Sequence, residues 1–290
     1  FKMKWKRILA MILAVASCLS LAVSASAANT VTRKATDFRD YDRTAWYAEA
    51  VSAAVDNGLL YGKSATVIDP NGAMTRAEMA AIINRSFGCY KTADISQYKD
   101  VSKSAWYYKD VALAVQMGTY NGRSSSAMAP DAPISRQEAM TVVARALELD
   151  YDAYAKTDLS QFADRDKISA WALPYVRAMV GADYIHGRGK VLAPQDDITR
   201  AEFAQIFANI IGTYITAKGS YDKDVKGSVL IRTDEVTLQN MTVDGDLIIG
   251  CGSADGKITL DNVTIKGRLL VWGGGTKAVY CNNGTQMPEV

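Results

Sequence analysis

Apolar positions recur at helical spacing in the segment WYAEAVSAAVDNGLL, which runs from Trp46 to Leu60. One stripe of the predicted helix contains Trp46, Ala50, Val51, Ala54 and Val55. Gly58 follows at a position where a left-handed residue commonly ends a helix. After a loop with glycines and a proline, a second apolar stripe begins near Thr75 and contains Met79, Ile82, Ile83 and Phe87. The pattern therefore predicts a helix–loop–helix unit.

The same unit returns twice, because its landmarks recur at nearly constant distances. A tryptophan precedes the start of the second helix by 29, 29 and 28 residues, in the pairs Trp46–Thr75, Trp106–Ser135 and Trp171–Thr199. An aromatic-x-Asp triplet stands ahead of each tryptophan and ends at Asp40, Asp100 or Asp164. Neither helix can bury its stripe alone, so three units of about 50–55 residues are expected to pack around a shared centre.

Beyond about Thr216 apolar residues alternate with polar ones, which is typical of strands. The segment VTLQNMTVDGDLIIG from Val236 matches ITLDNVTIKGRLLVW, which starts 22 residues later. This spacing predicts coils of a parallel β-solenoid with an asparagine ladder formed by Asn240, Asn262 and Asn282. The earlier segment GSVLI is expected to belong to a preceding coil, which makes about three coils in all. No segment resembles a cap, so the module is expected to be short or truncated.

The N-terminus has the three parts of a secretory signal peptide: a basic start (MKWKR), an apolar run (ILAMILAVASCLSLAV) and small residues (SASAA). Ala25 and Ala27 form an Ala-x-Ala site, so residues 1–27 are expected to be removed. An alternative interpretation is a lipoprotein cleavage box, VASC, which ends at Cys18. No other stretch approaches the about 20 apolar residues that cross a bilayer, so the mature protein is expected to be exported without a membrane segment.

Composition narrows the function further. The chain has 290 residues, of which 49% are hydrophobic and 22% charged, and its formal net charge is +2. These values fit a folded protein of about two domains rather than a disordered tail or a polybasic nucleic-acid binder. Cys89, Cys251 and Cys281 match no zinc-binding spacing, and no cofactor is expected. The sequence leaves a Cys251–Cys281 disulfide open.

Each second helix opens with a box of the form T/S-R-x-E, in the segments MTRAEMAAIINR, ISRQEAMTVVAR and ITRAEFAQIFAN. The hydroxyl residue suits an N-cap, and the glutamate three places later completes a capping box in which each side chain satisfies a backbone N–H group. The three box glutamates are Glu78, Glu138 and Glu202. Folding therefore explains both residue types.

The box arginines, Arg76, Arg136 and Arg200, have no such local explanation. A cation in the first turn of a helix is unfavourable by about 0.3–1 kcal/mol. A guanidinium beside helix N–H groups suits an external anion, so we expect these residues to bind one. The alternative is a structural ion pair with the upstream aspartate of the same or a neighbouring repeat. If the arginines bind, Arg76→Ala and Arg136→Ala should weaken binding and leave helix content nearly unchanged.

The tryptophans and aspartates indicate what kind of molecule would carry that anion. A single tryptophan on an apolar stripe is more often part of a core, but Trp46, Trp106 and Trp171 recur at a fixed distance from an arginine, where an indole ring can cover the face of a sugar. Asp40, Asp100 and Asp164 can accept hydrogen bonds from hydroxyl groups or orient the arginine. An anionic sugar would use all three residue types.

Together these residues resemble the S-layer homology family. The shared pattern is F-x-D, WY, AV, G, P and TRAE in this order, and it extends from Phe38 to Thr213. The resemblance implies a multidomain α + β chain, with a pseudo-trimeric helical spindle, grooves between its prongs, and then the short solenoid. It also implies non-covalent binding to a secondary cell-wall polysaccharide of a Gram-positive-type bacterium, whose pyruvate ketals present a carboxylate. The aspartates, tryptophans and box arginines named above are then the expected groove residues.

The expected boundaries are 28–92, 93–150 and 151–215 for the three repeats, 216–227 for a linker and 228–290 for the solenoid coils. Repeat three departs most from the family pattern. Ala172 follows its tryptophan where the other repeats have tyrosine, and Asn209 stands where they have Arg85 and Arg145. Its groove is therefore the weakest match to the family.

Two other function classes remain open. One is a secreted polysaccharide-degrading enzyme, because parallel β-solenoids often carry such activity. Against it, no carboxylate pair has acid–base spacing, and the 22-residue match places Lys266 and Arg268 opposite Asp244 and Asp246. His186 is expected in a solvated loop. The other class is a surface scaffold with the solenoid as spacer. We predict non-catalytic anchoring at the cell wall, with peptidoglycan-associated polymers as further partners.

Overall fold

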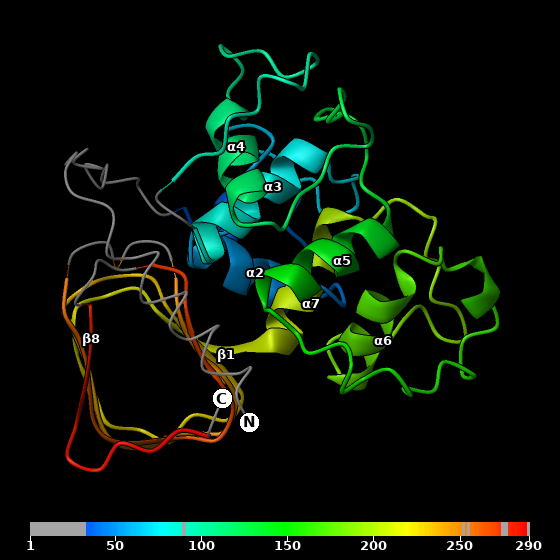
Figure 1. The fold of residues 1–290 in the computed structure, drawn as a ribbon. Coiled ribbons are helices and arrows are strands. Elements are labelled where there is room, and N and C mark those ends of the chain that lie inside the picture. Colours follow the sequence, from blue (N-terminus) through cyan, green and yellow to red (C-terminus); the bar gives the residue numbers. More distant parts are fainter. Residues whose placement is uncertain (1–32, 89–90, 251–252, 254–255, 274–277, 289–290) are drawn as a thin grey trace.

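The computed structural model describes residues 33–88, 91–250, 253, 256–273 and 278–288. The predicted signal peptide, Cys18, Cys89 and Cys251 lie outside these ranges, and Cys281 is exposed on the last described strand. Three pairs of helices come first along the chain, and two parallel sheets follow (Figure 1). None of the helices in the described ranges is both long and apolar enough to cross a membrane.

The three predicted helix–loop–helix units are confirmed. Their first helices are α2 (Ala48–Asp56), α4 (Tyr108–Gln116) and α6 (Leu173–Gly181). Their second helices are α3 (Arg76–Ser86), α5 (Arg136–Ala146) and α7 (Arg200–Ile210). Two short 3₁₀ helices, η1 (Ala35–Asp37) and η2 (Arg165–Lys167), precede α2 and α6. Gly58 ends the first unit's α2 with a φ of 68°, as its position after the apolar stripe predicts.

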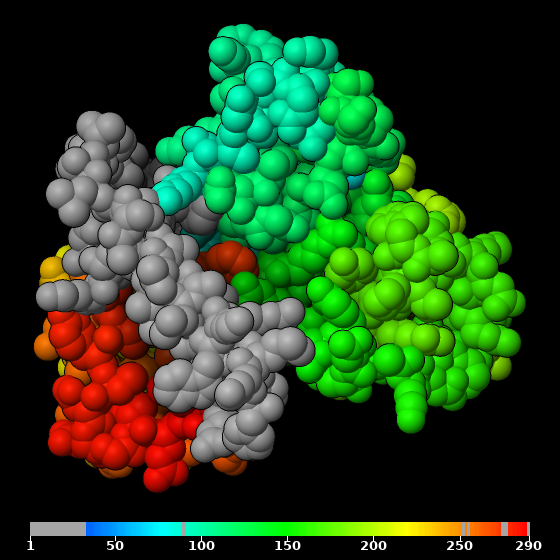
Figure 2. All heavy atoms as spheres, in the orientation of Figure 1, coloured from blue at the N-terminus to red at the C-terminus, as the bar shows by residue number. Residues whose placement is uncertain are grey.

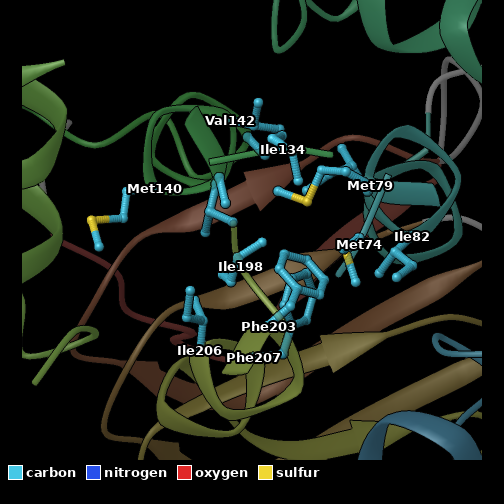
Figure 3. Close-up of a cluster of buried hydrophobic side chains, with 14 of the residues drawn as sticks. Met74, Met79, Ile82, Ile134, Met140, Val142, Ile198, Phe203, Ile206 and Phe207 are labelled. Carbon is cyan, nitrogen blue, oxygen red and sulfur yellow. The ribbon is translucent and has the colours of Figure 1, made fainter. Parts of the chain in front are cut away.

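The repeats share one centre. The residue directly before each box is fully buried, namely Met74, Ile134 and Ile198. The backbones of these three residues form a ring of hydrogen bonds. The Met74 amide donates to Ile198, Ile134 to Met74, and Ile198 to Ile134, each at 3.0 Å. Figure 3 shows their side chains among those of the second helices, including Phe203. The helical unit is thus pseudo-trimeric, as expected.

The helices pair between repeats rather than only within them. Helix α3 packs against α4, α5 against α6, and α7 against α2, so that the second helix of each repeat packs on the first helix of the next. Repeat three closes the ring by packing on repeat one. Figure 2 shows repeats two (cyan to green) and three (green to yellow) as separate lobes that project from the shared centre.

The solenoid consists of two four-stranded parallel sheets. One contains β1 (Ile211–Ile215), β3 (Ser228–Ile231), β5 (Leu247–Ile249) and β7 (Leu269–Val271). The other contains β2 (Gly219–Tyr221), β4 (Val236–Val243), β6 (Ile258–Ile265) and β8 (Val279–Asn282). Val236 pairs with Ile258, which confirms the 22-residue offset. Alternate residues of β4 and β6 point into a continuous apolar core.

Two expectations about the solenoid need correction. The segment 216–227 is not a linker, because β1 starts directly after α7 and β2 lies within that segment, paired with β4. The first strands are too short to show alternation in the sequence. The third position of the asparagine ladder is Asn283, not Asn282, because the last coil is one residue shorter and pairs Ile258 with Val279.

The ladder itself follows from backbone conformation. Asn240, Asn262 and Asn283 all adopt left-handed φ values, of 51°, 55° and 47°, which asparagine tolerates better than most residues. The Asn262 amide donates to the Asn240 side-chain oxygen at 2.9 Å. Asn283 donates instead to Asp261 at 2.5 Å. The ladder therefore marks the corner at which each coil turns.

The solenoid is docked against the helices, and does not extend from them as a spacer. Leu230 and Ile248, on the outer face of the first sheet, are fully buried in the helical core. Arg232 donates to the Arg85 carbonyl at 2.7 Å, and the Trp272 indole N–H donates to Ala146 at 2.8 Å. The carbonyl groups at the C-terminal ends of α3 and α5, which lack partners within their own helices, thus receive donors from the solenoid.

Candidate functional site

The three boxes cap their helices as predicted. The Thr75 hydroxyl accepts from the Glu78 amide at 3.2 Å, and the Glu78 carboxylate accepts from the Thr75 amide at 3.0 Å. Ser135 with Glu138, and Thr199 with Glu202, form the same reciprocal pair. Hydroxyl and glutamate therefore serve the fold in every repeat.

The helix N-termini are not open to an external anion, and this part of the prediction is wrong. The first two amides of α3, from Arg76 and Ala77, donate to the carbonyl groups of Ala132 and Pro130 at 3.0 and 2.8 Å. The corresponding amides of α5 and α7 donate to equivalent carbonyl groups, those of Asp196 and Pro194 and those of Gly72 and Pro70. Each helix start is thus docked onto the loop of the next repeat. We call these three contacts repeat joints 1–2, 2–3 and 3–1.

The box arginines lie inside these joints. Arg76, Arg136 and Arg200 are only 4%, 4% and 2% exposed. Each Nε donates to a carbonyl of the next repeat, at Met128, Leu192 and Ile68, over 2.8–2.9 Å. Each Nη1 faces the box glutamate of the next repeat, in the pairs Arg76–Glu138 (3.1 Å), Arg136–Glu202 (2.8 Å) and Arg200–Glu78 (3.7 Å). The structural ion pair is present, but its partner is a glutamate of the next box and not the upstream aspartate.

Burial makes the box arginines dependent on their partners. Burial lowers the pKa of Arg136 and of Arg200, and attraction to Glu202 and Glu78 respectively opposes that effect. Arg76 also lies over the Tyr120 ring at 4.9 Å, while the Tyr120 hydroxyl donates back to the Arg76 carbonyl at 2.7 Å. The positive end of the helix dipole disfavours an arginine in the first turn, and contacts with the neighbouring repeat compensate for this cost.

The aspartates of the aromatic-x-Asp triplets are half-buried or, in Asp100, exposed, but their carboxylates bind backbone amides of their own repeat. The two oxygens of Asp100 accept from the Met128 and Ala129 amides at 2.9 and 2.6 Å. Asp40 holds Ile68 and Asp69, and Asp164 holds Leu192 and Ala193, over 2.8–2.9 Å. Burial alone would raise the pKa of Asp100, but hydrogen bonds from the Met128, Ala129 and Asp100 amides, together with attraction to Arg76, lower it from its usual value of 3.8. These aspartates therefore fix the loops against which the box arginines pack.

The bonds to the aspartates stabilise a strained backbone. Asp69, Ala129 and Ala193 have left-handed φ values of 56°, 52° and 52°, which cost about 1–2 kcal/mol for residues other than glycine. Each precedes the proline of its loop, and each donates its amide to the aspartate of its own repeat. A charge-assisted hydrogen bond is of comparable magnitude and offsets the strain.

The tryptophans face solvent. Trp46, Trp106 and Trp171 are 64%, 62% and 52% exposed, so the expected place of Trp46 on the buried stripe of α2 is wrong. Helix α2 begins only at Ala48, and Trp46 lies in the preceding turn. The ring of Trp46 stands edge-on to Tyr47 at 5.5 Å, and Trp106 stands edge-on to Tyr107 at 5.4 Å. Ala172 cannot provide this support for Trp171.

Trp106 borders repeat joint 1–2. The hydroxyl of Tyr107, on which Trp106 rests, donates to Asp131 at 3.4 Å, and Asp131 follows the proline whose carbonyl caps α3. Arg123 donates to the carbonyl of Pro133, two residues further along the same loop, at 3.1 Å. The tyrosine beside Trp106 and the exposed guanidinium of Arg123 thus contact one loop.

The sequences of the three repeats match a known family. The model of the S-layer homology domain matches residues 37–80, 97–140 and 161–204. The chain contains three tandem S-layer homology domains. It is 34% identical to the surface-layer 125 kDa protein of Lysinibacillus sphaericus over 182 residues, and this match covers 61% of this chain and 15% of that protein. The solenoid follows the third domain directly.

Two further relatives differ in what their names describe. The cellulosome-anchoring protein of Acetivibrio thermocellus is 28% identical over 153 residues, which are 49% of this chain and 33% of that protein. An endoglucanase of Bacillus sp. (strain KSM-635) is 24% identical over 210 residues, which are 71% of this chain and 22% of that enzyme. The enzyme is matched through the S-layer homology domains. The chain therefore spans a third or less of the length of these relatives.

In each S-layer homology domain the sequence analysis missed an exposed cation that pairs with the box glutamate. The side chains of Lys63, Arg123 and Arg188 are 34%, 46% and 38% exposed. They pair with the box glutamates in Lys63–Glu78 (2.5 Å), Arg123–Glu138 (3.4 Å) and Arg188–Glu202 (2.6 Å). Each follows a glycine, in the dipeptides GK, GR and GR, and lies 14 or 15 residues before the box glutamate. This repeated spacing is the signal that would have found them.

The glycine is required because the triplet aromatic lies against it. A Cβ on Gly62 would be 2.4 Å from the Phe38 ring, and one on Gly122 would be 2.4 Å from the Tyr98 ring. Phe162 approaches Gly187 in the same way, at 2.6 Å. The aromatic-x-Asp triplet therefore holds both ends of the loop that carries the exposed cation.

Other candidate chemistry in the S-layer homology chain is weaker. His186 is exposed beside Asp183 at 3.1 Å, and Asp244 and Asp246 pair with Lys266 and Arg268 at 2.7 and 2.6 Å. Within the described ranges no group of three or more metal-ligating side chains is gathered. An open cleft of about 550 Å³ lies on the outer side of α2, but none of the predicted site residues lines it.

Proposed function

We propose that this chain anchors an exported protein non-covalently to the bacterial cell wall, at the extracellular surface of a Gram-positive-type cell. Its ligand would be a secondary cell-wall polysaccharide, with pyruvate ketals supplying the anion and peptidoglycan-associated polymers as further partners. The observation that carries the proposal is the threefold recurrence of an exposed tryptophan and an exposed cation. The surface-layer and cellulosome-anchoring relatives support it.

Different residues take different parts in this proposal. Trp46, Trp106 and Trp171 would cover sugar faces, because a large exposed indole is available as a platform and is not part of the core. Lys63, Arg123 and Arg188 would meet the carboxylate. The box arginines and the triplet aspartates, whose polar atoms are occupied by the protein's own groups, would position those contacts. This assignment revises the expectation that the arginines and aspartates touch the polymer directly.

The test uses wall sacculi from a bacterium with pyruvylated polymer, native and chemically depyruvylated. Wild-type protein should remain on native sacculi and be lost from depyruvylated ones. The triple variant Trp46→Ala/Trp106→Ala/Trp171→Ala should be lost from both, with unchanged thermal unfolding, since exposed rings contribute little to the core. Tyr280→Ala, which removes an exposed aromatic of the solenoid, is the matched control and should remain bound.

Three outcomes would count against the proposal. If wild-type protein were retained equally on both preparations, the pyruvate ketal would not be the group that is bound. If the tryptophan variant were retained as well as the wild type, the tryptophans would not be the sugar platforms. Release of reducing sugar from the sacculi would favour the polysaccharide-degrading alternative.

A further inference from the structure

The three repeat joints differ in how their exposed cation is paired, although their architecture is the same. In each joint one box glutamate lies between two cations, namely the buried box arginine of the preceding repeat and the exposed cation of its own repeat. At joint 3–1 the cations Arg200 and Lys63 face Glu78. At joint 1–2 the cations Arg76 and Arg123 face Glu138. In both joints the exposed cation has one carboxylate partner, the box glutamate of its own repeat.

At joint 2–3 the exposed cation has an additional carboxylate partner. Arg136 and Arg188 face Glu202 as expected, but Arg188 also donates from Nη1 to Asp196 at 2.8 Å. The equivalent positions, two residues after the loop proline, are Gly72 in repeat one and Ala132 in repeat two. Arg188 therefore pairs with two carboxylates, whereas Lys63 and Arg123 each pair with one.

The three exposed cations also differ in how many of their hydrogen-bond donors are occupied. All three nitrogens of Arg188 are engaged, with Nε and Nη2 on the two oxygens of Glu202 at 2.6 and 3.0 Å and Nη1 on Asp196. Its bond with Glu202 raises the pKa of Arg188, and Asp196 acts in the same direction. Arg123 has only a 3.4 Å contact with Glu138 besides the Pro133 carbonyl. Lys63, with three donors on its ammonium group, reaches Glu78 with one contact.

We propose that Asp196 is an internal anion that occupies the place of the polymer carboxylate at joint 2–3, so that the chain binds two anionic groups, at Lys63 and at Arg123, rather than three. This rests on the proposed function. An external carboxylate that approached Arg188 would have to displace Asp196 and would be repelled by its charge, whereas Lys63 and Arg123 have no ion pair with a loop aspartate among the described contacts. Trp171, without a tyrosine behind it, gives the same joint a less supported sugar platform.

The experiment counts sites on the full chain by calorimetric titration. The probe is the methyl glycoside of a hexose that carries a 4,6-linked pyruvate ketal. Wild-type protein should bind two equivalents, and Asp196→Ala, which gives repeat three the residue of repeat two, should bind three. Lys63→Ala or Arg123→Ala should each weaken one of the two sites by about tenfold or more, because a charge-assisted hydrogen bond is lost. Arg188→Ala should leave two sites.

The matched control is Asp197→Ala, which removes the same charge one residue further along the chain and should leave two sites. Three sites in the wild type, two sites in Asp196→Ala, or an equal gain in both aspartate variants would overturn the inference. Absence of probe binding would overturn it too. If the wild type is nevertheless retained on native sacculi and lost from depyruvylated ones, only the inference fails. If it is retained on neither, the proposed function fails with it.

Discussion

The most direct test of the joint architecture is Arg76→Ala. The three terminal nitrogens of Arg76 contact Met128 at 2.9 Å, Glu138 at 3.1 Å and the Asn121 carbonyl at 2.8 Å, all in the next repeat. Removing one partner of a buried ion pair costs about 3–5 kcal/mol, because the other charge stays buried without compensation. Glu138 retains Arg123 and is 18% exposed, which places the expected loss at the lower end, about 3 kcal/mol.

The control is the other cation on the same glutamate. Arg123 is 46% exposed and lies 3.4 Å from Glu138, so Arg123→Ala should cost only about 0.2–1 kcal/mol, as exposed pairs do. Arg76→Lys should recover little, since an ammonium cannot reproduce three bonds in the fixed fork of a guanidinium. The sequence analysis expected Arg76→Ala to leave the helix content nearly unchanged, on the assumption that the arginine is open to a ligand. Because Arg76 is buried, we now expect this variant to lose helix content at a lower urea concentration than the wild type.

The assay is urea unfolding of the full chain, followed by far-UV circular dichroism. The free energy of unfolding is obtained by linear extrapolation, and the slope must agree among the variants for the comparison to hold. Wall binding of Arg76→Ala should be measured well below its unfolding transition. If Arg76→Ala and Arg123→Ala destabilise the protein equally, by less than about 1 kcal/mol, the buried pair does not hold the joint and the reasoning fails.

Two further predictions follow from the described contacts. Asp100→Asn should destabilise the protein at neutral pH, and the difference from the wild type should shrink as the pH falls from about 4 towards 2. The reason is that the pKa of Asp100 is lowered from 3.8 in the folded protein, so its carboxylate stabilises the fold at neutral pH and loses this contribution when it is protonated. If the difference in free energy of unfolding between wild type and variant did not change with pH, the argument would be contradicted. Trp272→Phe removes the indole donor to Ala146 and should cost about 1 kcal/mol in urea unfolding, whereas no change would mean that this bond does not hold the solenoid against α5.

The docked solenoid bears on how the chain unfolds. Its outer residues belong to the same buried cluster as the second helices, and its first strand continues from α7. Because every repeat packs on its neighbour in a closed ring, loss of one joint also exposes the apolar surface of two repeats. This arrangement couples the stability of the joints to that of the whole helical unit.

The local features of this protein were determined by the sequence alone. Capping boxes such as Thr75 with Glu78, the left-handed end of α2 at Gly58 and the 22-residue register of β4 with β6 all depend on partners at short or regular spacing. A hydrogen bond within one helical turn follows from a three-residue spacing, and stacked side chains of successive coils follow from the 22-residue spacing of the solenoid. The prediction of three helical units around one centre depended on the same regularity.

Only the tertiary structure decided which side chains meet solvent and which meet another repeat. Arg76 finds Glu138 in the next repeat, and Arg200 finds Glu78 across the closure of the ring, at separations that no spacing rule reveals. Ring closure buries these arginines and leaves Trp46 in an exposed turn ahead of its helix. A guanidinium that looks unsatisfied in its own helix takes its partners from the neighbouring loop, because burial without them would cost several kcal/mol.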